Sequence, residues 1–122
     1  MSARHILIIE DDSDNTALLR LLLERQGYQV SLALNGEQGL QKVRSLYPDL
    51  VVLDLDMPVM DGWSVLREIK TDTHIRHIPV IVVTAHLMPD EKETVLQAGA
   101  SGYVLKPFSV QGLVGEVERL LK

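Results

Sequence analysis

The 122-residue sequence contains no cysteine, no long apolar run and no cluster of basic residues. Without cysteine the chain can form no disulfide, no zinc–thiolate site and no cysteine nucleophile. No apolar stretch approaches the roughly 20 residues that a membrane-spanning helix requires. The N-terminal stretch MSARHILIIEDD lacks the small-residue cleavage site of a secretory signal. These absences favour a cytoplasmic protein that does not enter a membrane.

The charge balance argues against one further class of partner. The formal net charge is −5, whereas proteins that bind nucleic acid rely on basic side chains to neutralise phosphates. We therefore expect no direct binding to nucleic acid. The length fits one domain, and 46% of the residues are hydrophobic, which is enough for a substantial core. We expect a single domain spanning residues 1–122.

Apolar runs of strand length alternate with segments of helical period along the whole chain. Strands are expected at 5–10, 28–33, 50–54, 78–84 and 102–106, and helices at 14–25, from Asn35 to Leu46, at 62–71, at 89–99 and from Ser109 to Lys122. The first helix is predicted from the spacing of its apolar stripe, which is Ala17, Leu18, Leu21 and Leu22. Strict alternation predicts a doubly wound α/β fold, with parallel strands and helices on both faces of the sheet. Because the last helix reaches the final residue, the pattern favours a stand-alone protein.

Charged and hydroxyl side chains are found where the expected strands end. In doubly wound sheets, ligands bind beyond the carboxyl ends of the strands. The residues at these ends are Glu10 and Asp11, Asp54 and Asp56, Thr84, and Lys106. Carboxylates brought this close raise each other's proton affinity, and a hard cation with oxygen ligands removes the repulsion. Mg²⁺ fits best, because it accepts carboxylates, waters and a phosphate oxygen.

The same edge also has the components of phosphoryl transfer. A phosphoryl group arriving there would meet the cation and the ammonium group of Lys106 on its equatorial oxygens. A carboxylate can itself act as the nucleophile and form an aspartyl-phosphate.

Four segments carry a resemblance to a known family: ILIIEDD, PDLVVLDLDMPVMDG, IPVIVVTAH and GYVLKPF. In this order, each at an expected strand exit, they resemble the receiver domains of bacterial response regulators, a family that includes the chemotaxis response regulator. The resemblance implies a flavodoxin-like (βα)5 fold with strand order 2-1-3-4-5. It also implies a phosphoprotein of two-component or phosphorelay signalling. Such a protein is not an enzyme in the ordinary sense, because it catalyses only its own phosphorylation and dephosphorylation.

The resemblance also implies roles for the residues of the site. Asp54 would accept the phosphoryl group, Asp11 would bind Mg²⁺ directly, and Glu10 would bind it through water. Asp56 stands where the family offers a backbone carbonyl to the metal, so its side chain is not expected to matter. The neighbouring Asp12 is expected to favour the helix that follows rather than to join the site.

Three further residues complete the implied switch. Thr84 would bond one phosphoryl oxygen through its hydroxyl, and Lys106 would pair with another, with a cis bond between Lys106 and Pro107. Tyr103 would turn inward when Thr84 moves, which would change the surface of the fourth helix, the fifth strand and the fifth helix. The implied partners are a histidine kinase or a histidine phosphotransfer protein and a downstream protein target, with the receiver a monomer or a phosphorylation-dependent dimer.

Two other functions fit parts of the sequence. Asp54-Leu55-Asp56 after a strand is also typical of haloacid-dehalogenase-like, Mg²⁺-dependent phosphohydrolases. That motif normally opens the chain, and here no length remains for a substrate-covering cap. A receiver-like scaffold that acts without phosphorylation is the second alternative, and the presence of Asp54, Thr84 and Lys106 argues against it.

Overall fold

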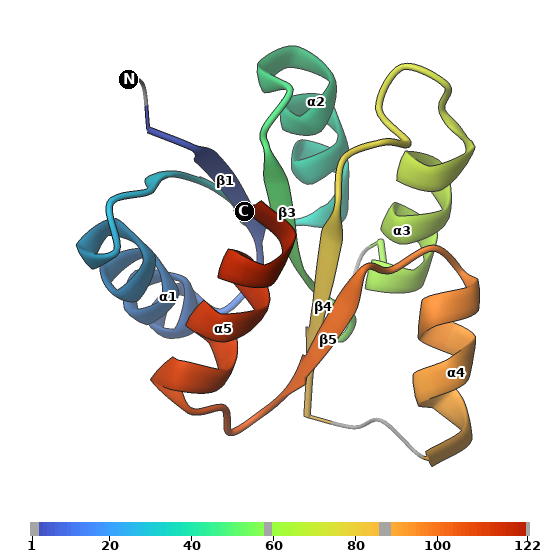
Figure 1. The fold of residues 1–122 in the computed structure, drawn as a ribbon. Helices are drawn as coiled ribbons and strands as arrows, with labels where there is room; N and C mark the ends of the chain where they lie inside the picture. Colours follow the sequence, from blue (N-terminus) through green and yellow to red (C-terminus); the bar gives the residue numbers. More distant parts are fainter. Residues whose placement is uncertain (1–2, 58–59, 86–88, 122) are drawn as a thin grey trace.

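The computed structural model describes residues 3–57, 60–85 and 89–121, with residues 89–91 described for their backbone only. Five strands and five helices alternate along these described residues, as predicted (Figure 1). They are β1 (His5–Ile9), α1 (Ser13–Arg25), β2 (Gln29–Ala33), α2 (Gly36–Leu46), β3 (Leu50–Asp54), α3 (Gly62–Thr71), β4 (Val80–Thr84), α4 (Pro89–Gln97), β5 (Gly102–Leu105) and α5 (Val110–Leu121). The strands form one parallel sheet in the order β2-β1-β3-β4-β5. The predicted fold class and strand order are therefore confirmed.

Helices cover both faces of the sheet and divide the core in two. Figure 1 shows α1 and α5 on one face and α2, α3 and α4 on the other. Alternate residues of each strand pack into the two cores, because successive side chains of a strand point to opposite faces. Leu53 of β3, for example, packs on the α2–α4 side, whereas its neighbour Val52 packs on the α1–α5 side. Every residue of β3 and β4 is buried, which is typical of central strands in a parallel sheet.

Polar side chains fix where several helices begin. Asp12, Asn35 and Asp61 each cap a helix by accepting hydrogen bonds from backbone N–H groups of its first turn. Ser109 does the same for α5, accepting from the N–H of Gly112 at 2.9 Å. The predicted caps at Asn35 and Ser109 are thus confirmed, and Asp12 serves the helix as expected.

The packing of α1 differs from the sequence prediction. The helix itself is confirmed, but its buried residues are Thr16, Leu19 and Leu23. Leu18 and Leu21 of the predicted stripe are about half exposed, at 50% and 48%. Leucines occupy so many positions of this helix that two apolar stripes have helical spacing, and spacing alone does not choose between them.

No helix in the described ranges is both long and apolar enough to cross a bilayer. The predicted element limits differ from the observed ones by a few residues. The clearest case is β4, which begins at Val80 rather than at residue 78, because Pro79 has no N–H to donate to the sheet.

The start of α3 lies directly against the end of β3. A Cβ atom added to Gly62 would lie 2.4 Å from the carbonyl oxygen of Asp54 and 2.5 Å from the Cα of Leu55. Both atoms belong to the backbone and have little freedom to move. The N–H of Gly62 also donates to the carbonyl of Leu55 at 3.1 Å. Only glycine fits this contact, which anchors the segment after Asp54.

We predict that Gly62→Ala lowers the free energy of unfolding by about 1–3 kcal/mol, the usual range for overpacking. Gly115→Ala is the matched control, because a Cβ there meets nothing within 4 Å. That change should raise stability by up to about 1 kcal/mol through helix propensity. Urea unfolding of the three proteins measures both effects, and equal midpoints for Gly62→Ala and the unaltered protein would contradict the assigned contact.

Candidate functional site

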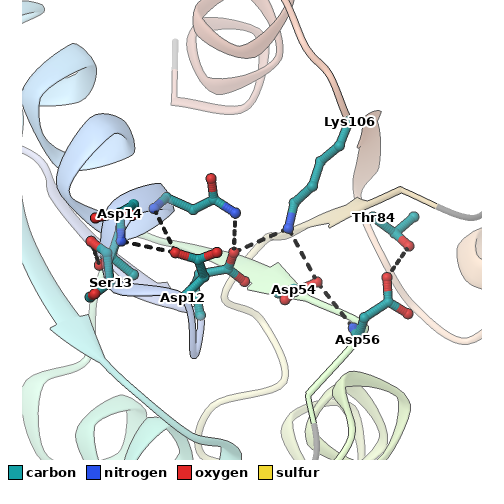
Figure 2. Close-up of polar contacts among 10 residues, drawn as sticks. Asp12, Ser13, Asp14, Asp54, Asp56, Thr84 and Lys106 are labelled. Carbon is teal, nitrogen blue, oxygen red and sulfur yellow. Dashed lines mark hydrogen bonds and ion pairs between the residues drawn. The ribbon is translucent and has the colours of Figure 1, made fainter.

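The polar residues predicted at the strand ends meet at one edge of the sheet. Asp54 and Thr84 are the last residues of β3 and β4, while Glu10 and Lys106 directly follow β1 and β5. Figure 2 shows Asp54, Asp56, Thr84 and Lys106 turned toward one another across this edge. Although Glu10 and Lys106 are 96 positions apart in the sequence, their side chains are in contact.

Three carboxylates form the centre of this site. Glu10, Asp11 and Asp54 each present an oxygen atom, and these atoms all lie within 4.8 Å of one another. Glu10 and Asp54 are buried, at 2% and 4% exposure, while Asp11 is exposed. The burial of two mutually repelling carboxylates is unfavourable unless a cation or a proton compensates for it.

Lys106 provides a positive charge at this centre. Its Nζ lies 3.1 Å from Glu10 Oε1 and 3.7 Å from Asp54 Oδ1. Partial burial acts against the charge on Lys106, but the hydrogen bond to Glu10 and the charges of Asp54, Glu10 and Asp56 outweigh it and raise the pKa of Lys106. The lysine therefore remains an ammonium group, and its bond to Pro107 is cis, as expected.

The two oxygens of Asp54 have different surroundings. Oδ1 faces Lys106 and accepts the backbone N–H of Asp56 at 3.0 Å (Figure 2). No hydrogen-bond donor from the described part of the chain reaches Oδ2. One oxygen therefore orients the carboxylate, and the other is left available for chemistry.

The two carboxylate oxygens of Glu10 also have different surroundings. Its Oε1 accepts hydrogen bonds from Lys106 Nζ and, at 3.0 Å, from Asn15 Nδ2. Its Oε2 is buried and has no hydrogen-bond partner among the residues that the structure describes. Burial, followed by hydrogen bonding with Asp54, raises the pKa of Glu10 from 4.5 to about 7. Near neutral pH, Glu10 can therefore be protonated in part of the molecules.

This donor set fits a magnesium ion. A buried carboxylate oxygen without a partner is a feature that a bound cation explains, since buried polar atoms are normally satisfied. The available donors are all oxygens, which is the ligand type that Mg²⁺ requires, and Mg²⁺ needs only one or two carboxylates beside its waters. Asp11 and Asp54 can supply these carboxylates, and the Glu10 carboxylate lies next to both of them.

A second set of contacts links Thr84 with Asp56. The Thr84 side chain is fully buried, and its hydroxyl donates to Asp56 Oδ2 at 3.0 Å. The sequence analysis expected only the backbone of Asp56 to take part in the site, and it did not anticipate this contact of the side chain. Tyr103 is half-buried beside the α2–α4 core, and Lys92 Nζ lies 5.6 Å from the centre of its ring.

The sequence analysis also missed Asn15. This residue lies in the first turn of α1, and its amide orients Glu10. The sequence contains part of the signal for its position. A residue in the first turn of a helix, four or five places after an acidic pair, faces back toward the strand end. An asparagine there has many other uses, so the residue type alone does not identify the contact.

Three comparisons with known proteins point to one family. The family model for the response regulator receiver domain matches residues 6–118. A polar-differentiation response regulator, DivK of Brucella anthropi, is 36% identical over 118 residues, which cover 97% of this chain and 96% of that protein. The chemotaxis protein CheY4 of Vibrio cholerae has a TM-score of 0.91 at 25% identity, covering 98% of this chain and 99% of that one.

A further solved structure with a similar fold contains a metal ion. It is the receiver domain of the sensor histidine kinase PA1611 from Pseudomonas aeruginosa, with a magnesium ion coordinated in its active-site cleft. Its TM-score is 0.89 at 32% identity, with 98% of both chains covered. The family model matches nearly the whole chain and the DivK relative is more than one third identical, so this chain belongs to the response regulator receiver domain family of two-component signalling.

Proposed function

We propose that residues 1–122 act as one receiver domain that is switched by phosphorylation of Asp54 in the presence of Mg²⁺. The observation that carries this proposal is the arrangement around Asp54. One of its oxygens is held by the N–H of Asp56 and faces Lys106, while the other has no donor from the described residues. An oriented carboxylate with one available oxygen beside a cation is well suited to attack phosphorus.

The transfer step can be written with the residues of the site. Oδ2 of Asp54 attacks the phosphorus of a phosphohistidine, the new O–P bond forms as the P–N bond breaks, and the imidazole keeps the electron pair of that bond. Lys106 stabilises the charge on the equatorial oxygens. Mg²⁺, held by Asp11, Asp54 and the backbone carbonyl of Asp56 with Glu10 nearby, would neutralise the remaining negative charge. Attack of water on phosphorus later releases phosphate and restores Asp54.

A hollow beside Lys106 supports a protein as the phosphoryl donor. Its volume is about 350 Å³, and its lining includes Leu18, Pro107 and Phe108. Leu18 is half exposed even though it lies in a helix that buries other leucines. A donor whose histidine reaches Asp54 must pass this apolar surface, which can therefore bind a histidine kinase or phosphotransfer protein.

The output of the switch follows from Thr84 and Tyr103. A phosphoryl group on Asp54 draws the Thr84 hydroxyl toward it, and the vacated space lets the half-buried ring of Tyr103 turn inward. The surface of α4, β5 and α5 then changes, and a downstream protein, or a second copy of this domain, binds the new surface. This output requires that the partner bind the two states with different affinity.

Asp54→Asn should abolish phosphorylation. Incubation of the unaltered protein with acetyl phosphate and Mg²⁺ is expected to add the mass of one phosphoryl group, as read by intact-protein mass spectrometry. Asp61→Asn is the matched control, because it removes the same charge and keeps a good helix cap. Failure of the unaltered protein to gain mass, or a gain in Asp54→Asn, would contradict the assignment. Repeated turnover of a small phosphate ester would favour the phosphohydrolase alternative instead.

Glu10 is predicted to make stability depend on pH when divalent cations are removed. The folded state holds a proton on Glu10 up to a pKa of about 7, whereas the unfolded state loses it near 4.5. In EDTA the free energy of unfolding should therefore fall as pH rises from about 4.5 through 7. Glu10→Gln should remove this contribution, and Mg²⁺ should offset the loss at high pH. Urea unfolding at several pH values tests the prediction, and equal slopes for the two proteins would contradict it.

A further inference from the structure

The Thr84 hydroxyl bonds to a carboxylate that the proposed mechanism does not use. It donates to Asp56 Oδ2 at 3.0 Å, and Figure 2 shows this contact on the side of Asp56 away from Lys106. The donor is fully buried and the acceptor is exposed. A hydrogen bond to an ionised acceptor is about twice as strong as one between neutral groups, so the contact holds Thr84 firmly.

A threonine hydroxyl has one hydrogen and can donate it to one acceptor at a time. In the proposed switch, that hydrogen must go to a phosphoryl oxygen on Asp54. The bond to Asp56 and the bond to the phosphoryl group are therefore alternatives. Activation exchanges one anionic acceptor for the other, so the difference in free energy between the two bonds contributes to the free energy of activation.

The position of Asp56 is tied to Asp54 through the backbone. The N–H of Asp56 donates to Asp54 Oδ1 at 3.0 Å, so the two aspartates are held in a fixed relation. The charge of Asp56 also acts on Lys106. Asp56 is therefore close enough to compete with a phosphoryl group on Asp54, although its side chain is exposed.

We propose that Asp56 is a positioning residue that retains the Thr84 hydroxyl in the resting state and so opposes switching until a phosphoryl group displaces it. This inference rests on the proposed phosphorylation of Asp54. It means that the Asp56 carboxylate competes with the phosphoryl group for the Thr84 hydroxyl, whose movement is the first step of the proposed switch. The strength of the competitor sets how completely phosphorylation converts the domain to its active form.

The proposal is tested by measuring how tightly the Mg²⁺-saturated protein binds beryllofluoride, which takes the place of the phosphoryl group. Four proteins are compared: the unaltered chain, Asp56→Ala, Thr84→Val and the double variant. Asp56→Ala should bind roughly tenfold more tightly, because a charge-assisted competitor has been removed. In the Thr84→Val background, the same change should alter affinity by less than about twofold, since the hydroxyl is already absent.

The double variant distinguishes the effect of the Thr84–Asp56 hydrogen bond from the effect of the negative charge of Asp56. If the gain from Asp56→Ala persists in Thr84→Val, the charge of Asp56 repels the ligand and the proposal is wrong. Weaker binding by Asp56→Ala would also overturn it. Asp14→Ala removes one exposed negative charge from the same end of the sheet and should leave the affinity nearly unchanged.

A second measurement decides the proposal even if beryllofluoride fails to bind. Methyl-labelled protein without ligand reports the side-chain rotamer of Thr84 through its NMR scalar couplings. We expect one dominant rotamer in the unaltered protein and a shift in the rotamer populations in Asp56→Ala. An unchanged rotamer in the variant would overturn the inference about Asp56, whereas absence of beryllofluoride binding to the unaltered protein would count against phosphorylation of Asp54.

Discussion

The structure depends most on the crowding of buried carboxylates at one edge of the sheet. Glu10 and Asp54 are almost fully buried and lie beside Asp11, while Lys106 provides the cation that contacts both buried carboxylates. Negative charge therefore exceeds positive charge at a place with little access to water. Burial, followed by hydrogen bonding with Asp54, raises the pKa of Glu10, and the excess of negative charge makes the site suitable for a divalent cation. A group that brings more negative charge must arrive together with positive charge.

The fold creates this crowding and also limits it. Parallel strands bring their carboxyl ends to the same edge of the sheet. Residues at the ends of β1, β3, β4 and β5 therefore meet there, although they lie far apart in the sequence. The other acidic residues near the edge have different tasks. Asp12 and Asp61 turn their carboxylates onto backbone N–H groups at the starts of α1 and α3. Acidic residues close together in the sequence thus divide into helix caps and residues of the site.

Much of this arrangement was predictable from the sequence, because it depends on patterns that repeat along the chain. The alternation of strands and helices predicted the layers, and the strand ends located Asp54, Thr84 and Lys106. The face that α1 buries was not predictable, because leucines fill two stripes and only the neighbouring elements select Leu19 and Leu23. The contact between Thr84 and Asp56 and that between Asn15 and Glu10 depend on side-chain orientation, which residue spacing does not determine.

The pairing of Glu10 with Lys106 joins the first strand of the domain to the end of the last strand. A chain still emerging from the ribosome has made β1 and β3 long before it has made Lys106. Until then, Glu10 and Asp54 lack their lysine partner, and the edge that holds them lacks β5. The surroundings of the proposed phosphoryl acceptor are thus completed late in synthesis, after the strand that completes the sheet.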